Sequence, residues 1–182
     1  MKISSLFRLF CLLALLGSSS FLPASSTNPG SLQTAEYRLR LYHTHTNEHI
    51  DVVYRRGSQY LPGAIDQLNR FLRDHRTGTV HPYDPRVFDL LNELAASLGH
   101  ADSEINVICG YRTPWSNNFL RSRSSAVAEH SLHMQAEAID IRIPGIGTAT
   151  LRDAALALHR GGVGYYPASQ FVHVDVGRVR RW

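Results

Sequence analysis

The chain has 182 residues, with 19 Lys and Arg residues against 15 Asp and Glu residues and a formal net charge of +4 at pH 7. This length supports one domain with an adequate core and makes a second domain unexpected. The basic residues are dispersed along the sequence, which excludes the concentrated positive surface typical of nucleic-acid-binding proteins.

The first 26 residues form a targeting signal. Lys2 and Arg8 precede an apolar run at residues 9–16, and Ala24-Ser-Ser26 is an acceptable cleavage site. The run is shorter than the ~20 residues that span a membrane comfortably. We therefore expect export and no stable membrane insertion after cleavage, with an uncleaved leader as the alternative.

Residues 27–36 are rich in Ser, Thr, Asn, Pro and Gly, which indicates a flexible arm before a domain of residues 37–182. Residues 37–45 and 49–55 alternate apolar and polar side chains around Thr46-Asn-Glu48, which predicts a β-hairpin.

Three histidines, His43, His45 and His49, fall within this hairpin. They have no acidic or Cys companion at the spacing of a metal site. The pattern therefore favours exposed hairpin residues over a second metal site.

Two amphipathic helices follow. Pro62 marks the start of the first, which we expect to reach about His75, and the second follows Asp84-Pro85 and stops at Gly99. Two later helices are expected on either side of a polar loop at residues 124–132. The four predicted helices cover residues 62–75, 86–98, 116–123 and 148–159.

Two strands carry the most informative polar residues. Ile139, Ile141 and Ile143 alternate with polar or small residues in the first, so Asp140 points away from the core. Val172, Val174 and Val176 form one face of the second, so His173 and Asp175 lie on the other. If the strands are neighbours, Asp140 and His173 come close together.

His133 precedes the first of these strands and completes a set of three possible zinc ligands with Asp140 and His173. Zinc hydrolases commonly use three protein ligands and leave a fourth position for water. A single His in a strand more often forms a hydrogen bond or faces solvent.

Cys109 is the only cysteine that would remain after removal of the leader, so no internal disulfide is expected. It ends an apolar run, which favours a buried structural thiol over a nucleophile. A role as a soft zinc ligand is a minor alternative.

Several motifs match a known family beyond the three candidate ligands. The chain resembles the LAS group of zinc peptidases, which includes D-alanyl-D-alanine carboxypeptidases and peptidoglycan endopeptidases, and is most similar to the MepK-like murein endopeptidases. The resemblance covers nearly all of the chain after residue 36. It rests on Gly110-Tyr-Arg-Thr113, Ser131-Leu-His133, the spacing from His133 to Asp140, Phe171-Val-His-Val-Asp175, Asn69-Arg-Phe-Leu-Arg-Asp74, Asp84-Pro85, Arg121-Ser-Arg-Ser124 and Gly161-Gly-Val-Gly-Tyr-Tyr-Pro167.

The resemblance implies an α+β, hedgehog-like LAS fold with zinc on a central antiparallel sheet. It implies that Arg112 and Ser131 contact the substrate; the alternative for Arg112 is a surface salt bridge. Many members have an acidic general base where this chain has Gln170, although the MepK-like branch also lacks it. The base is left open, with Glu129, His130 and Asp175 as candidates.

The expected protein is a periplasmic, monomeric zinc peptidase that hydrolyses stem-peptide cross-links of peptidoglycan. In the MepK-like branch the bond joins two diaminopimelate residues (a 3-3 link), with 4-3 links as possible further substrates. The mild positive charge suits an anionic cell-wall polymer. The alternatives are a non-catalytic zinc module that binds peptidoglycan, and a D-alanyl-D-alanine carboxypeptidase.

Overall fold

The structure, a computed structural model, describes residues 34–124 and 127–182, and Thr34–Trp182 groups into one unit. The expected signal at residues 1–26 and most of the expected arm lie outside the described residues. The last residue of that arm is not loop, because Glu36 already begins a strand. No helix in the described part of the chain has the length and hydrophobicity needed to cross a membrane.

The predicted hairpin is present. Strands β1 (Glu36–His43) and β2 (Glu48–Arg56) pair antiparallel. Asn47 adopts a positive φ of 58° in the turn between them, a conformation that Asn tolerates better than most residues. A short strand that the sequence did not predict, β3 (Gln59–Tyr60), continues the sheet beside β2.

Each predicted helix is present, with shifted ends: α1 (Pro62–Phe71), α2 (Arg86–Ser97), α3 (Pro114–Arg121) and α4 (Thr148–Leu158). Helix α1 ends four residues before the predicted His75, because the chain turns there and Asp74 carbonyl oxygen accepts the Gly78 N–H at 2.7 Å. Helix α3 begins two residues early, because the Thr113 side chain caps it by accepting the Ser116 N–H at 3.2 Å.

A single sheet of eight strands organises the domain, in the order β3-β2-β1-β4-β5-β7-β6-β8. The remaining strands are β4 (Ile105–Cys109), β5 (Ala138–Arg142), β6 (Gly162–Tyr166), β7 (Phe171–Asp175) and β8 (Arg180–Arg181). Because β1 pairs parallel with β4 and β6 pairs parallel with β8, the sheet is mixed. The strands that carry the candidate site, β4, β5, β7 and β6, pair antiparallel as expected, and the two parallel pairings join β1 and β8 to them. The α+β class is confirmed.

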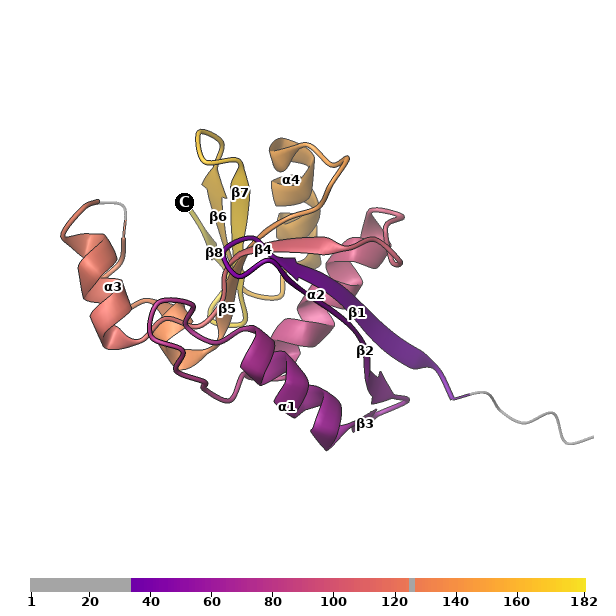
Figure 1. Cartoon of the computed structure of the whole chain (residues 1–182). Coiled ribbons are helices and arrows are strands. Elements are labelled where there is room, and N and C mark those ends of the chain that lie inside the picture. The colour runs from indigo at the N-terminus through magenta and orange to yellow at the C-terminus, as the bar shows by residue number, and fades with distance from the viewer. Residues whose placement is uncertain (1–33, 125–126) are drawn as a thin grey trace, which may run out of the picture. The chain divides into compact units, whose positions relative to one another are not determined.

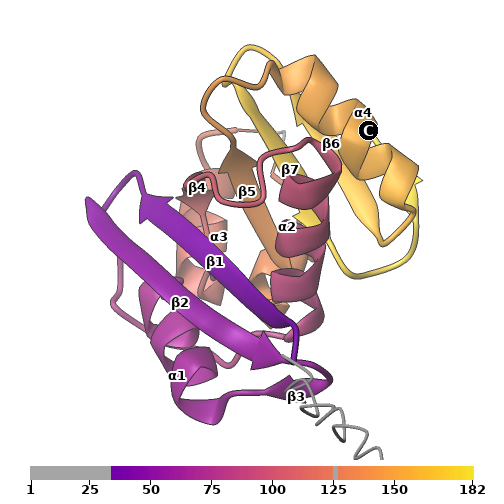
Figure 2. The same ribbon diagram turned by 90° about the vertical axis from the view of Figure 1, so that its right-hand side faces the viewer.

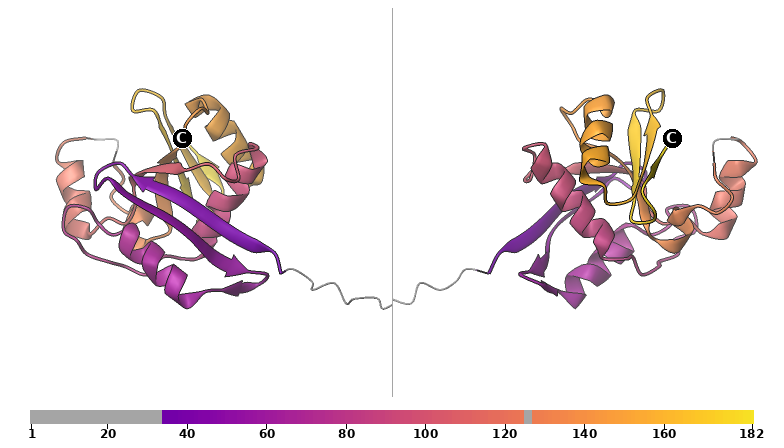
Figure 3. Two further views of the ribbon diagram at one scale, coloured as in Figure 1. Left: turned by 45° about the vertical axis from the view of Figure 1, so that its right-hand side comes forward. Right: turned by 180° about the vertical axis from the view of Figure 1, so that it is seen from behind.

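The core lies on the face of the sheet that carries the alternating isoleucines and valines. Ile139, Ile141, Val172 and Val174 are all at most 1% exposed. Helix α4 packs on β6 and β7 and also contacts α2, as Figure 2 shows. Helix α3 lies on the opposite side of β5 and β7 from α2 and α4 (Figures 1 and 3). The polar face of these strands is therefore turned toward α3.

A short 3-10 helix, η1 (Leu132–Gln135), begins at the last residue of the predicted polar loop of residues 124–132. Ala136 follows η1 with φ 53° and is fully buried. Gly adopts this left-handed conformation at a lower energetic cost than Ala does.

Candidate metal centre

Strand pairing places a row of residues across the polar face of the sheet. Asp140 on β5 pairs with Cys109 on β4 and with His173 on β7, and His173 pairs with Gly164 on β6. Side chains of directly paired residues project from the same face of a sheet. The prediction that Asp140 and His173 are close neighbours is confirmed.

Three donor atoms form a nearly equilateral triangle. His133 Nε2 lies 3.2 Å from Asp140 Oδ1 and 3.1 Å from His173 Nδ1, and the latter two atoms are 2.9 Å apart. Asp140 and His173 are only 6% and 7% exposed, so the face that the sequence placed away from the core is nevertheless buried. His133 of η1 and the Trp182 ring, which lies 5.1 Å from the His173 ring between centroids, pack against this face.

His133 is held in one orientation by the backbone around it. The Ser131 hydroxyl accepts the His133 N–H at 3.4 Å and caps η1, and the His133 carbonyl accepts the Arg112 N–H at 3.1 Å. His133 Nδ1 contacts the Gly110 carbonyl oxygen at 2.8 Å, so Nδ1 carries the proton. Nε2 is then unprotonated and directs its lone pair into the triangle, as a metal ligand requires.

Asp175 supports His173 from the side away from the triangle. Its Oδ2 lies 3.1 Å from His173 Nε2, and its carboxylate also accepts two hydrogen bonds from Arg180 at 3.0 and 2.7 Å. The Gly162 and Gly177 N–H groups complete its partners. Asp175 therefore orients His173 and binds Arg180.

The charges at the triangle suit a cation. Burial lowers the pKa of His133 to about 4, so this imidazole is neutral at pH 7. Burial tends to raise the pKa of Asp140, but His133 and His173 outweigh it and hold the pKa below its usual range. Burial opposes charge on His173, while Asp140 and Asp175 raise its pKa. The site thus places a buried carboxylate beside two imidazoles.

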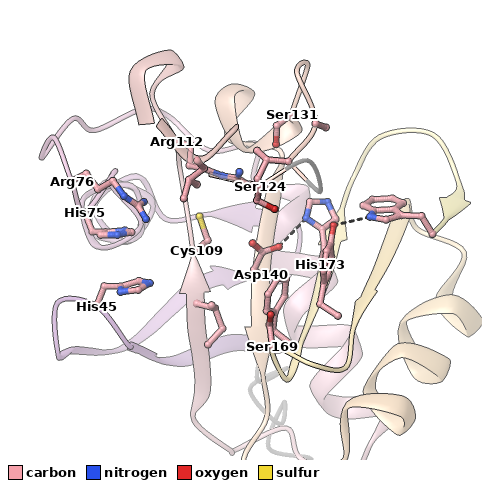
Figure 4. Close-up of a pocket in the computed structure, with 17 residues that line it drawn as sticks. His45, His75, Arg76, Cys109, Arg112, Ser124, Ser131, Asp140, Ser169 and His173 are labelled. Carbon is pink, nitrogen blue, oxygen red and sulfur yellow. Dashed lines mark hydrogen bonds and ion pairs between the residues drawn. The ribbon is translucent and has the colours of Figure 1, made fainter. Parts of the chain in front are cut away.

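A cavity of about 350 Å³ opens over the triangle. Figure 4 shows Arg112 directed into it above Asp140, with Cys109 between Asp140 and the far wall. Asn117 Oδ1 accepts one Arg112 guanidinium N–H at 3.2 Å, and the Asn117 amide donates to Ala128 carbonyl oxygen at 3.0 Å. Asn117 therefore fixes Arg112, a contact that the sequence alone did not reveal.

Arg112 is only 8% exposed, and its Nε has no hydrogen-bond partner among the described residues. The surface salt bridge that was the alternative for this residue is therefore not observed. Ser131 also lines the cavity, so both expected substrate contacts face the same space.

The three candidate bases do not line this cavity in the described part of the chain. Glu129 and His130 are exposed, and Glu129 lies 3.4 Å from Arg121 Nη2. Asp175 is fully buried with its oxygens occupied. Gln170 lines a separate cavity, bounded in part by Arg142.

The far wall of the cavity consists of residues that the sequence did not assign to the site, namely His45, His75 and Arg76. His45 and His49 are exposed, as expected, but His43 is fully buried and the prediction for it was wrong. His43 packs edge-on against Phe71 and His75, at 5.9 and 5.8 Å between ring centroids. The loop after α1 closes over this end of the hairpin, a long-range contact that the sequence pattern does not contain.

Comparison with known proteins agrees with the triangle and its surroundings. Residues 32–182 match the family described as "Peptidoglycan L,D-endopeptidase MepK". The chain belongs to this family of peptidases. It is 42% identical over 144 residues to Peptidoglycan L,D-endopeptidase MepK of Escherichia coli strain K12, a match that covers 79% of each chain. It is 39% identical over 137 residues to a probable MepK of Haemophilus influenzae, covering 75% of this chain and 74% of the relative.

Membership of this metallopeptidase family calls for a metal, and two overlapping donor sets are present. Cys109, His133 and Asp140 have ligand atoms within 4.8 Å of one another. The atoms of His133, Asp140 and His173 lie closer, at 2.9–3.2 Å. Tetrahedral zinc with bonds of about 2.0 Å separates its ligand atoms by roughly 3.3 Å.

The second set therefore fits zinc almost without movement. Burial raises the pKa of the Cys109 thiol to about 12, and the thiol donates to Gly110 carbonyl oxygen at 3.6 Å. Cys109 is thus a protonated, buried thiol beside the triangle, in line with the structural role expected for it.

Proposed function

We propose that this chain is an exported zinc-dependent endopeptidase that hydrolyses stem-peptide cross-links in peptidoglycan. The observation that carries the proposal is the triangle of His133 Nε2, Asp140 Oδ1 and His173 Nδ1 beneath a cavity lined by Arg112 and Ser131. The names of the relatives supply the substrate class. The expected export signal places the protein in the periplasm, where that polymer is found.

His133, Asp140 and His173 would hold the zinc. When bound, zinc lowers the pKa of a water and polarises the amide carbonyl. Asp140 supplies the anionic ligand, and Gly110 and Asp175 fix the ring orientations of the two histidines. These contacts keep the three donor atoms in place before the metal arrives.

Arg112 and Ser131 position the substrate in this proposal. Asn117 holds the Arg112 guanidinium, whose remaining N–H groups face the cavity and suit a carboxylate or a peptide carbonyl. We propose the diaminopimelate–diaminopimelate 3-3 link as the bond, with 4-3 links as a further substrate. In the 3-3 link the acceptor residue has a free carboxylate next to the scissile amide, which Arg112 would bind.

The test is digestion of purified sacculi by the protein without residues 1–26, followed by muropeptide chromatography with mass detection. Wild type with zinc should remove cross-linked dimers, whereas chelated protein and His173→Ala should not. His49→Ala is the matched control, because His49 is an exposed histidine outside the cavity. Full activity in His173→Ala would refute the assigned metal set.

A peptidoglycan-binding module without hydrolysis is the second candidate. It is favoured by one observation: none of the candidate bases lines the cavity in the described part of the chain. Sacculi that bind the zinc-loaded protein and release no soluble fragments would establish it. Release of free alanine in place of longer fragments would instead indicate a D-alanyl-D-alanine carboxypeptidase.

A further inference from the structure

The cavity has two chemically different ends. Asp140 and His173 form one end, and His45, His75 and Arg76 form the other (Figure 4). The proposed metal centre uses only the first. The second end has a guanidinium and two imidazoles that face the same space and that the proposed reaction leaves without a role.

Arg76 has no carboxylate within ion-pair distance among the described residues. Its guanidinium lies 5.9 Å from the centroid of the Phe119 ring, which is a weak contact. Arg112 likewise makes no ion pair in the described part of the chain. A cavity with two such guanidiniums, and with Asp140 as the sole carboxylate among the described residues that line it, is complementary to a ligand with more than one negative charge.

Arg76 is presented by a fixed loop. Asp74 is fully buried and accepts the Arg76 N–H at 2.9 Å, the Thr113 N–H at 2.8 Å and the Thr113 hydroxyl at 2.7 Å. These bonds tie the loop after α1 to the start of α3. The Asp74 carboxylate is used on backbone and hydroxyl donors, so the Arg76 guanidinium remains available to a ligand.

The two imidazoles beside Arg76 form a stacked pair. The rings of His45 and His75 lie 4.2 Å apart between centroids and 12° from parallel. His43 contacts both residues: its Nδ1 accepts the backbone N–H of His45 at 3.2 Å, and its ring packs edge-on against His75. The nitrogen lone pairs of two parallel rings lie in separate, parallel planes, so they do not converge on one point, which disfavours chelation of one metal.

Burial lowers the pKa of His75 to about 4 and also lowers that of His45, with His45, His43 and Arg76 adding to the effect on His75. Asp74 acts in the opposite direction on His75. At neutral pH both rings are therefore uncharged; His75 can donate one N–H, whereas the Ile108 backbone interacts with the His45 ring. Among the described residues that line this end of the cavity, Arg76 alone carries a full positive charge.

We propose that Arg76, with the His45–His75 pair, forms a second carboxylate subsite, which binds a stem-peptide carboxylate away from the scissile amide. This inference rests on the proposed function, in which Arg112 takes the carboxylate beside that amide. A 3-3 link contains the D-centre carboxylate of the donor diaminopimelate, and the adjoining isoglutamyl residue has an α-carboxylate. Both have the chemistry that this end recognises.

The test is a thermodynamic cycle in which one charge is removed from the protein and one from the substrate, separately and together. Arg76→Gln and wild type are assayed on soluble 3-3 cross-linked peptides with all carboxylates free, with the donor diaminopimelate amidated, or with the isoglutamyl carboxylate amidated. Arg70→Gln is the matched control, because Arg70 is an exposed arginine on α1 outside the cavity. Thermal unfolding checks that each variant folds.

We expect Arg76→Gln to lower kcat/KM about tenfold on the free peptide, mainly through KM, which corresponds to about 1.4 kcal/mol. Amidation of the recognised carboxylate should lower wild-type kcat/KM by a similar factor and leave Arg76→Gln nearly unaffected, which also identifies the carboxylate. An equal tenfold loss on all three peptides, or a loss matched by Arg70→Gln, would overturn the subsite.

Failure of the proposed function gives a different result. If wild type cleaves none of the peptides, the endopeptidase proposal fails, and calorimetric binding of the same three peptides then tests the subsite in the same cycle. Binding that weakens about tenfold in Arg76→Gln only while the recognised carboxylate is free supports the subsite. Binding that is independent of Arg76 refutes it.

Discussion

Asp74→Asn is the substitution whose effect the structure defines most closely. Both carboxylate oxygens are engaged: Oδ1 accepts the Arg76 N–H, and Oδ2 accepts the N–H and hydroxyl of Thr113. An amide group has only one acceptor oxygen. Whichever way the substituted amide is turned, its NH₂ group faces a backbone N–H, and one buried donor loses its partner.

The pKa of Asp74 gives the size of the electrostatic contribution. Burial opposes ionisation, but the nearby Ser116 hydroxyl and the hydrogen bonds from Thr113 and Arg76 lower the pKa from 3.8 to about 2. A shift of this size corresponds to about 2 kcal/mol of stability at pH 7. A second, independent estimate comes from the buried N–H that loses its acceptor, which costs about 1–3 kcal/mol. We therefore expect Asp74→Asn to lower the free energy of unfolding by about 2 kcal/mol.

The pH dependence of this loss follows from the sign of the shift. Because the folded pKa is depressed, the contribution is complete well above the unfolded pKa of 3.8 and disappears as the pH falls below the folded value of about 2. At pH 3 roughly half of it should remain. The difference between wild type and Asp74→Asn should therefore narrow on acidification.

Urea unfolding of the metal-free protein, at pH 7 and at pH 3, measures the loss of unfolding free energy and its dependence on pH. The slope of the unfolding free energy against urea concentration should be the same in both proteins. At pH 7 the melting temperature should fall by about 4–8 °C. Asp66→Asn is the control, because Asp66 is an exposed carboxylate on α1. A difference below about 0.5 kcal/mol at pH 7, or one that does not shrink at pH 3, would refute the reasoning.

Three further substitutions test the site. Cys109→Ala should retain one equivalent of zinc by elemental analysis and lose about 1 kcal/mol of stability. Loss of zinc would favour Cys109, His133 and Asp140 as the ligands. Gly110→Ala should destabilise by about 1–3 kcal/mol in thermal unfolding, because a Cβ there would lie 2.6 Å from Leu72 carbonyl oxygen; an unchanged melting temperature would contradict this. Arg180→Leu should cost about 2 kcal/mol and weaken zinc binding about tenfold in competition with a chelator, because it leaves Asp175 without its cation; wild-type zinc affinity would show that Asp175 orients His173 unaided.

Two of the three candidate metal ligands, Asp140 and His173, were predictable because their strands have a strict period of two. Once Ile139 and Ile141 are assigned to the core, Asp140 must face the other way, and the same reasoning applies to His173 between Val172 and Val174. Pairing of β5 with β7 was the single assumption, and it was confirmed. The burial of that polar face was not predictable, since it depends on how η1 and the C-terminal Trp182 return over the sheet.

The far wall of the cavity illustrates the opposite case. His43 and His75 are separated by 32 positions, and no periodic pattern connects a strand residue to a loop residue. Their contact arises because Asp74 ties the loop after α1 to Thr113, which brings His75 and Arg76 against the hairpin. A lone Asp before a His-Arg pair has no signature in sequence, because the donors that fix the loop to α3, the N–H and hydroxyl of Thr113, lie 39 positions further along the chain.

The position of Gln170 bears on the same cavity. Gln170 has φ 55° in the turn before β7, and it lines the other cavity, beside Arg142. Because Gln170 lines this other cavity, its amide adds no group to the lining of the metal cavity. Among the described residues that line the metal cavity, Asp140 is the sole carboxylate, and it lies within the triangle. The basic side chains that line the cavity outside the triangle are those of His45, His75, Arg76 and Arg112. A ligand with several carboxylates therefore meets guanidiniums on two sides of the cavity and no fixed negative charge between them.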